Sequence, residues 1–172
     1  MRVRRLIAIG AAGVMAATGV AVVASSPAGA GPPTNWPVDA QIKAKGDPFY
    51  SGIEIFGNAE PGQIRTVFAL PGETALFRLR VQNTKFQNNR IEVCEEGFGG
   101  GLIRVLDGKT DVTEAVLGPC YRKKVGPRGF FDLKVKVRPE AGGAGIQFHV
   151  GSVNLGEEAD HVIAEAENLL DS

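Results

Sequence analysis

The chain has 172 residues, 44% of them hydrophobic, and its 19 Lys and Arg balance 19 Asp and Glu to a formal charge of zero. This balance excludes the strongly basic class of nucleic-acid-binding proteins, whose surfaces concentrate Lys and Arg.

The first thirty residues have the layout of a secretory signal peptide. Three arginines within the first five residues precede an apolar run over residues 6–24, and residues 28–30 read Ala-Gly-Ala, an A-x-A cleavage site. An uncleaved anchor is the alternative, because a membrane span needs about 20 apolar residues. The glycines within the run and the A-x-A end favour cleavage. We therefore expect residues 1–30 to be removed, leaving a secreted, extracellular protein without membrane insertion.

Removing the first 30 of 172 residues leaves 142, the size of one ordinary domain. The mature chain then carries 16 basic and 19 acidic side chains, and six of the acids fall within residues 157–172. Residues 31–156 hold 16 basic and 13 acidic side chains, an excess too small to predict a nucleic-acid partner.

Short alternating segments follow an extended, proline-rich lead-in at residues 31–38. Apolar and polar residues alternate strictly in residues 131–138 and less strictly in residues 75–82 and 145–153, a period of two that places one type on each face of a strand. We expect weaker strands at residues 40–45, 50–56, 64–69, 89–94, 102–106 and 120–125. Many short strands separated by Gly, Pro, Asn and Asp are typical of a β-sandwich or barrel.

The remaining segments are turns, loops and an ambiguous tail. Asp107-Gly108 predicts a turn, and residues 110–116 predict one helical turn with Thr110 as its cap. The glycine-rich residues 97–101 predict a flexible loop. Residues 157–172 fit either a helix with one apolar face or an alternating strand, and periodicity does not decide between them.

Cys94 and Cys120 are the two cysteines of the chain. In an exported protein a pair of this kind predicts a disulfide, which would stabilise the fold by roughly 3 kcal/mol. A metal or redox pair is the alternative. The C-x-x-C spacing and the neighbouring histidine that would support it are both missing from the sequence.

Three segments together resemble a known family: PGETALFRLRVQN (71–83), LIRVLDGKTDVTEAV (102–116) and VGPRGFFDLKVKVRPE (125–140). They resemble bacterial secreted immunoglobulin-like modules of the cell-adhesion-related and NPCBM-associated kind, over roughly residues 38–167. The resemblance implies an all-β, immunoglobulin-like β-sandwich of seven to nine antiparallel strands, which we place at residues 39–168 with an acidic tail end at 169–172. It also implies a last strand near residues 160–167 and no catalytic residues. The scrambled Pro-Gly turn at residues 126–129 departs from the family pattern.

Residue types for catalysis are sparse. His149 lies on the polar phase of a predicted strand and His161 lies in the acidic tail, while the serines lack a G-x-S-x-G environment. We therefore expect no enzyme and no cofactor. Asp107 and Asp111 could offer oxygens to calcium, but a turn and a helix start explain them better, so no metal is expected.

A basic stripe is the best candidate for recognition. Arg78 and Arg80 share the outward phase of one strand, and three more cations, Lys134, Lys136 and Arg138, share that of another. If these strands are neighbours, five cations crowd one sheet face, where like charges placed opposite each other are destabilising. Such a face could serve an anion: an envelope polymer, a partner protein or the chain's own acidic tail. An ordinary solvated face with Lys and Arg stems covering apolar surface is the alternative.

The sequence thus favours a secreted, non-catalytic β-sandwich that binds an anionic envelope polymer or a protein partner through this basic face. One alternative is a protease inhibitor presenting the loop at residues 95–101, or an enzyme with an unfamiliar site. Another is a structural module that associates with itself through an open sheet edge.

Overall fold

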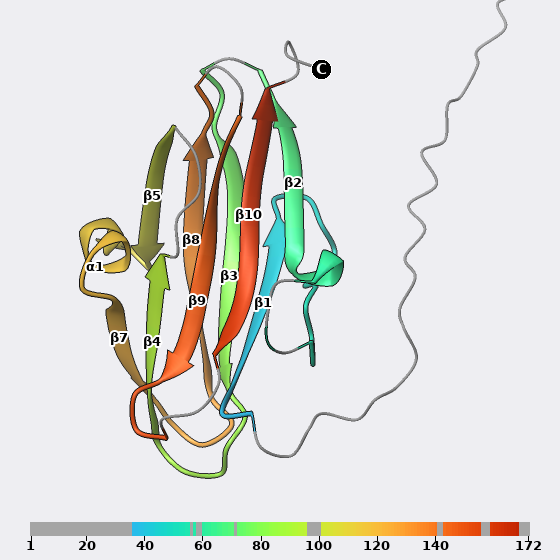
Figure 1. The fold of residues 1–172 in the computed structure, drawn as a ribbon. Coiled ribbons are helices and arrows are strands. Elements are labelled where there is room, and N and C mark those ends of the chain that lie inside the picture. The colour runs from blue at the N-terminus through green and yellow to red at the C-terminus, as the bar shows by residue number, and fades with distance from the viewer. Residues whose placement is uncertain are drawn as a thin grey trace, which may run out of the picture.

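In the described part of the computed structural model, ten strands form two packed sheets, accompanied by one short α-helix and one 3-10 turn (Figure 1). The structure describes residues 36–55, 57, 60–70, 72–95, 101–140, 143–155 and 159–168. The expected signal peptide and most of the lead-in lie outside these ranges. No helix in the described part of the chain is long and apolar enough to cross a membrane.

The first sheet, sheet I, has the strand order β1-β3-β8-β5-β6, and all its pairs are antiparallel. Its strands are β1 (Val38–Ala44), β3 (Ala75–Asn83), β8 (Phe130–Arg138), β5 (Leu102–Asp107) and β6 (Thr110–Asp111).

The second sheet, sheet II, has the order β2-β10-β9-β4-β7. Its strands are β2 (Ile64–Ala69), β10 (Asp160–Asn168), β9 (Ala144–Ser152), β4 (Asn89–Glu95) and β7 (Tyr121–Val125). All its pairs are antiparallel except the parallel pair of β10 with β2. The 3-10 turn η1 (Pro61–Gln63) leads into β2.

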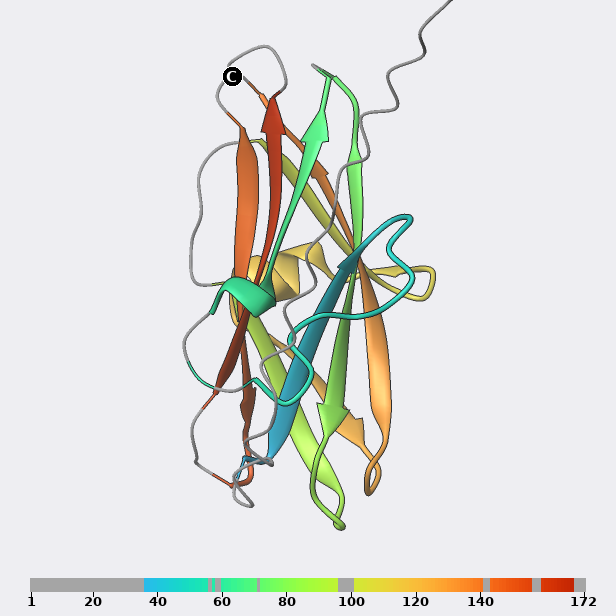
Figure 2. The ribbon, with the colours of Figure 1, turned by 90° about the vertical axis from the view of Figure 1, so that its right-hand side faces the viewer.

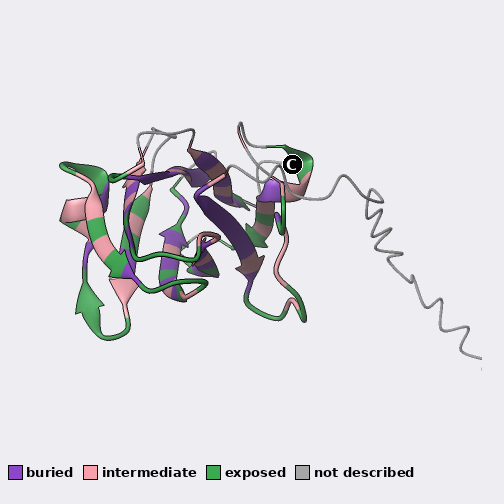
Figure 3. Ribbon diagram, turned by 90° about the horizontal axis from the view of Figure 1, so that it is seen from below, coloured by how far each residue is buried: buried purple, intermediate pink, exposed green. Residues whose placement is uncertain are grey.

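The core lies between the sheets because each central strand points alternate apolar side chains inward. Phe77 and Leu79 of β3 share one buried core with Phe148 of β9 and Val162 of β10, and all four are at most 1% exposed. Figure 2 shows the two layers edge-on, and Figure 3 shows the buried segments inside and the exposed loops at the rim. This is the all-β, immunoglobulin-like sandwich that was predicted, although it has ten strands rather than seven to nine.

Different elements close the sandwich at its two lateral edges, where the two sheets would otherwise leave the core open. On one side α1 (Thr113–Leu117) contacts both β4 and β5 (Figure 1). Val112, just before the helix, and Val116 within it belong to the core. The Cys94–Cys120 disulfide forms as predicted and ties β4 to the start of the neighbouring β7. On the other side, polar groups of η1 and β10 meet the edge strand β1.

Most predicted strands are confirmed to within two residues, and the tail is a strand, β10. Its alternating Val162, Ala164 and Ala166 fill the core between β9 and β2, a position that a helix could not occupy within the sheet.

Two predictions at the edges of sheet I are wrong. Residues 50–56 do not form a strand among the described residues, because only Ser51 bridges to β1 before Gly52 and Glu54 turn the backbone to positive φ. Thr110 is not a helix cap, because it pairs with β5 as part of β6. The helix begins at Thr113, whose N–H is accepted by the Asp111 carboxylate at 3.1 Å.

Candidate anion-binding groove

Three cationic residues from three neighbouring strands stand in one row on the outer face of sheet I. In the register of the sheet, Lys43 of β1 lies opposite Arg78 of β3, and Arg78 lies opposite Lys134 of β8. All three side chains point outward, because the residues on either side of each one along its strand lie in the core and side chains of a strand alternate between its faces. Adjacent strands are about 4.8 Å apart, so the row spans roughly 10 Å across the sheet. The adjacency on which the predicted basic stripe depends is therefore observed.

A groove of about 410 Å³ lies beside this row. Its lining residues come from β1, the turn that follows it, β3 and β8; they are Lys43, Ala44, Lys45, Gly46, Asp47, Leu76, Phe77, Arg78 and Lys134. Four of the nine are cationic, and Asp47 is the single acid. Its carboxylate accepts the N–H of Ala44 at 2.9 Å and lies 3.6 Å from Arg65, so it is already engaged away from the row.

The row has no counter-charge among the described residues: no carboxylate there lies within ion-pair distance of Lys43, Arg78 or Lys134. The Lys43 ammonium instead lies over the ring of Tyr50, 4.8 Å from its centroid. Like charges directly opposite on neighbouring strands destabilise a sheet. The row therefore works against stability and has an electrostatic potential that suits an anion.

Arg80, also predicted for the basic face, is used within the protein. Its guanidinium donates to both carboxylate oxygens of Asp132, at 2.9 and 3.1 Å, and lies between the rings of Tyr50 and Phe130. The hydrogen bonds to Asp132 raise the pKa of Arg80 further. A bidentate, stacked arginine of this kind is held in place and its charge is neutralised, so it contributes little to the groove.

The other two predicted cations lie further along β8. Lys136 stands opposite Leu76 and Arg104, and Arg138 stands opposite Leu102 near the end of the strand. Neither lines the groove, although Lys136 adds to its positive surroundings. Lys43 and Lys45 were missed, because the sequence indicates a strand there but does not reveal that it pairs with β3.

The two aspartates considered for calcium are engaged with protein donors. Asp107 accepts a hydrogen bond from the Tyr121 hydroxyl at 2.6 Å and another from the Lys123 ammonium. Asp111 accepts bonds from Thr113 and from Arg104, and the bonds from Thr113 lower its pKa to about 2. These partners favour the turn and helix-start interpretation, and the expectation that no metal binds there stays a prediction.

Sequence reasoning also missed a buried polar cluster between β1, η1 and β10. Asp160 and Gln63 have no exposed surface, and the Gln63 amide donates to one Asp160 oxygen at 2.5 Å. Asp39 is 4% exposed and accepts bonds from the Gln41 side chain and the Glu54 N–H. Burial raises the pKa of Asp160 to about 8 and that of Asp39 to about 6.

This cluster helps to close the open edge of β1. The outward N–H groups of Ala40, Ile42 and Ala44 are accepted by the Asp160 carboxylate, the Ser51 carbonyl and the Asp47 carboxylate, respectively. An edge with occupied N–H groups is a poor template for another strand. The self-association alternative is thus disfavoured at this edge. The loop considered for protease inhibition is described only at its ends, Glu95 and Gly101.

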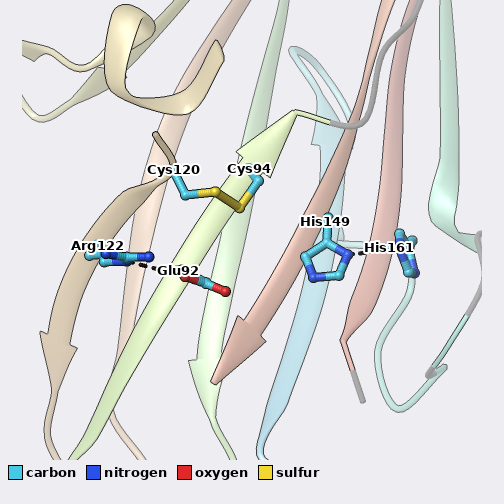
Figure 4. Close-up of a disulfide and its surroundings, with 6 residues drawn as sticks. All are labelled: Glu92, Cys94, Cys120, Arg122, His149 and His161. Carbon is cyan, nitrogen blue, oxygen red and sulfur yellow. Dashed lines mark hydrogen bonds and ion pairs between the residues drawn. A yellow bond between two sulfur atoms is a disulfide. The ribbon is translucent and has the colours of Figure 1, made fainter. Parts of the chain in front are cut away.

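A second missed arrangement lies on the outer face of sheet II. His149 of β9 and His161 of β10 stand directly opposite each other, with two ring nitrogens 3.2 Å apart. Figure 4 shows this pair on the same face as the disulfide and the Arg122–Glu92 ion pair. Glu92 also lies close to both cysteines, but sulfurs joined in a disulfide offer no thiolate to a metal ion.

No protein-family model and no curated protein matches the chain. Solved structures with a similar arrangement include the ASH / PapD-like domain of human CEP192, at 10% identity over 86% of this chain and 95% of that chain, with a TM-score of 0.44. A FixG-related protein from Vibrio parahaemolyticus is 12% identical over 77% of this chain and 97% of its own, with a TM-score of 0.43. The N-terminal domain of PorA is 13% identical over 76% and 97%, with a TM-score of 0.42.

At these identities and TM-scores the similarities carry no argument about function. The immunoglobulin-like sandwich is established by the strands and sheets themselves. The finer resemblance to cell-adhesion-related and NPCBM-associated modules stays a prediction.

Proposed function

We propose that this chain is a secreted, non-catalytic binding module whose groove on sheet I holds an anionic polymer of the cell envelope. The observation that carries the proposal is the row of Lys43, Arg78 and Lys134, three cations in register without a carboxylate partner in the described part of the chain. A sheet that only needed a soluble surface would place acids between them.

The geometry of the row favours a ligand with repeated charges. Three cations spaced about 4.8 Å apart match several anionic groups in a line better than a single carboxylate or phosphate. The chain's own acidic strand is a poor competitor, because Glu165 of β10 projects from the outer face of sheet II and is bonded to Thr66. An external polyanion suits the groove better than this part of the chain does.

Two further features support a binding role outside the cytoplasm. The nine lining residues include no Ser, Thr, Cys or His, and the single carboxylate, Asp47, is already engaged with the Ala44 N–H and with Arg65. The Cys94–Cys120 disulfide is compatible with an oxidising compartment, where such bonds form and persist.

The proposal is tested by binding to isolated cell envelopes and to a defined polyanion, polyphosphate, using residues 31–172. The test variant reverses the charge of all three residues of the row (Lys43→Glu, Arg78→Glu, Lys134→Glu). The matched control reverses three exposed cations elsewhere, Arg90, Lys109 and Lys124, and so has the same net charge. We expect the test variant to lose at least ten-fold in affinity and the control to lose much less, with wild-type binding falling as salt rises. Equal losses in both variants would contradict a groove-specific site, and retention by a protein fraction alone would shift the assignment to a protein partner.

A further inference from the structure

The two histidines of this chain converge although they lie twelve residues apart in sequence. His149 Nδ1 and His161 Nε2 are 3.2 Å apart, and the rings meet edge to face with centroids separated by 5.0 Å. Both side chains are half-buried on the outer face of sheet II (Figure 4). Their strands are hydrogen-bonded neighbours in the sheet, so the backbone fixes the approach of the two rings.

The contact of His161 with the backbone defines its tautomer. His161 Nδ1 lies 2.7 Å from the carbonyl oxygen of Gly57. A carbonyl oxygen only accepts, so Nδ1 must carry the proton, and in the neutral ring the lone pair is then on Nε2. That lone pair is on the nitrogen that faces His149. A histidine that ligates a metal ion is typically held in this way, with its other nitrogen donating to a carbonyl or carboxylate.

The distance between the two nitrogens suits a shared metal ion. Zinc binds imidazole nitrogen at about 2.0–2.1 Å, so two nitrogens in a tetrahedral site are separated by about 3.3 Å. The observed 3.2 Å already matches this separation, and rotation of the two rings about their side-chain bonds would turn both lone pairs toward the ion. Sheet II is also reinforced beside the pair, because His149 lies opposite Cys94, which the disulfide ties to β7.

We propose that His149 and His161 form a chelating site for a divalent transition-metal ion, with Zn²⁺ as the reference ion. The ion binds His161 through Nε2 and His149 through Nδ1, and water completes its coordination. On binding, the proton of neutral His149 moves from Nδ1 to Nε2, so both rings stay neutral and no proton is lost. Two protein ligands predict weaker binding than the three or four of catalytic and structural zinc sites. The site does not depend on the basic groove, which lies on the other sheet.

The alternative is a plain hydrogen bond in which His149 Nδ1 donates to His161 Nε2. The test separates the two on tag-free residues 31–172, in which His149 and His161 are the only imidazoles. Titration with ZnCl2 in a calorimeter should give one ion per chain for the wild type. His149→Gln and His161→Gln should each weaken binding at least ten-fold, while Glu165→Gln/Glu167→Gln, which removes two carboxylates from the same strand, should not.

Two readouts on folded protein complete the test. Zinc in excess should raise the Tm of the wild type and of the carboxylate control but not of the histidine variants. In the wild type alone, zinc should shift the ring nitrogen resonances of both histidines, which needs no variant to fold. An absence of zinc binding, unchanged affinity in His149→Gln, or unshifted ring resonances would each overturn the proposal.

Discussion

The carboxylate of Asp160, at the start of β10 in sheet II, accepts the backbone N–H of Ala40, in the edge strand of sheet I, at 2.6 Å. The same carboxylate accepts the Gln63 amide at 2.5 Å and the His161 N–H at 2.9 Å. One buried side chain thus joins both sheets and the 3-10 turn. Because every one of these partners is a donor, the position requires two acceptor oxygens.

Replacing Asp160 with Asn should destabilise the protein. The amide NH2 would face either the Ala40 N–H or the Gln63 amide, leaving a buried donor without an acceptor, which costs about 1–3 kcal/mol. Urea unfolding monitored by circular dichroism measures the loss at a pH above 8, where the raised pKa of Asp160 leaves its carboxyl ionised. Glu165→Gln, on the same strand but half-exposed, is the control and should change stability by less than about 0.5 kcal/mol. Equal effects at both positions would show that the Asp160 contacts are not important for stability.

Stability should fall as pH rises from about 5 to 8. Burial raises the pKa of Asp39 to about 6 and that of Asp160 to about 8, above the ordinary value of 3.8. Between the unfolded and folded values the folded protein holds protons that the unfolded chain has released. Each such proton lowers the free energy of unfolding by about 1.4 kcal/mol per pH unit. Urea unfolding in the presence of a chelator, at four pH values, measures this slope.

Asp39→Asn provides the matched variant for the pH experiment. It removes one of the two titrating groups, so the slope between pH 5 and 6 should become shallower. The slope between pH 7 and 8 should change less, because the Asp39 charge is only one of the causes that raise the pKa of Asp160. A wild-type stability that rises over this interval would contradict the raised pKa of both carboxyls.

Removing the disulfide should destabilise the fold without changing it. Cys94 and Cys120 are 26 residues apart, and closing a loop of that length restricts the unfolded chain by about 3 kcal/mol. The double variant Cys94→Ala/Cys120→Ala should therefore unfold at a lower urea concentration but keep the same far-ultraviolet spectrum. Unchanged stability would indicate that the bond does not constrain the unfolded chain.

Arg78→Glu should stabilise the protein while it weakens anion binding. The substitution replaces two repulsive cross-strand pairs, with Lys43 and with Lys134, by two attractive ones, each contributing roughly 0.2–1 kcal/mol. Arg90→Glu is the control, because Arg90 lies opposite another cation, Lys124, on sheet II. It replaces one repulsive cross-strand pair rather than two, so it should give a smaller gain in stability at low salt and keep the affinity for the polyanion. A loss of stability in Arg78→Glu would contradict the repulsive row.

The sequence predicts faces of strands better than neighbours of strands. The alternation in β3 and β8 identifies Arg78 and Lys134 as outward-facing, because side chains in a strand alternate whatever the strand pairs with. The partner of β1 is set by packing of the whole sandwich, so Lys43 could not be placed beside Arg78. The same reason hides the His149–His161 pair and the contact of Asp160 with Ala40, which joins residues 120 positions apart.

The local pattern of polar and apolar residues also predicts the wrong secondary structure, or leaves it undecided, where tertiary contacts determine it. Residues 50–56 have the composition of a strand, yet the backbone turns at Gly52, where φ is +87° and an added Cβ would lie 3.0 Å from the Ala40 carbonyl. In the tail, the apolar stripe fits a helix as well as a strand. The tail pairs with β9 on one side and β2 on the other, and only an extended chain can form both sets of backbone hydrogen bonds, so the tail is the strand β10.

The groove on sheet I is tested most directly by the affinity of residues 31–172 for polyphosphate and for isolated cell envelopes, measured at low and high salt in wild type, Arg78→Glu and Arg90→Glu. An anion-binding groove on sheet I predicts tight, salt-sensitive binding that Arg78→Glu reduces at least ten-fold and Arg90→Glu leaves nearly unchanged. Binding that persists in high salt, or that both variants reduce equally, would contradict it.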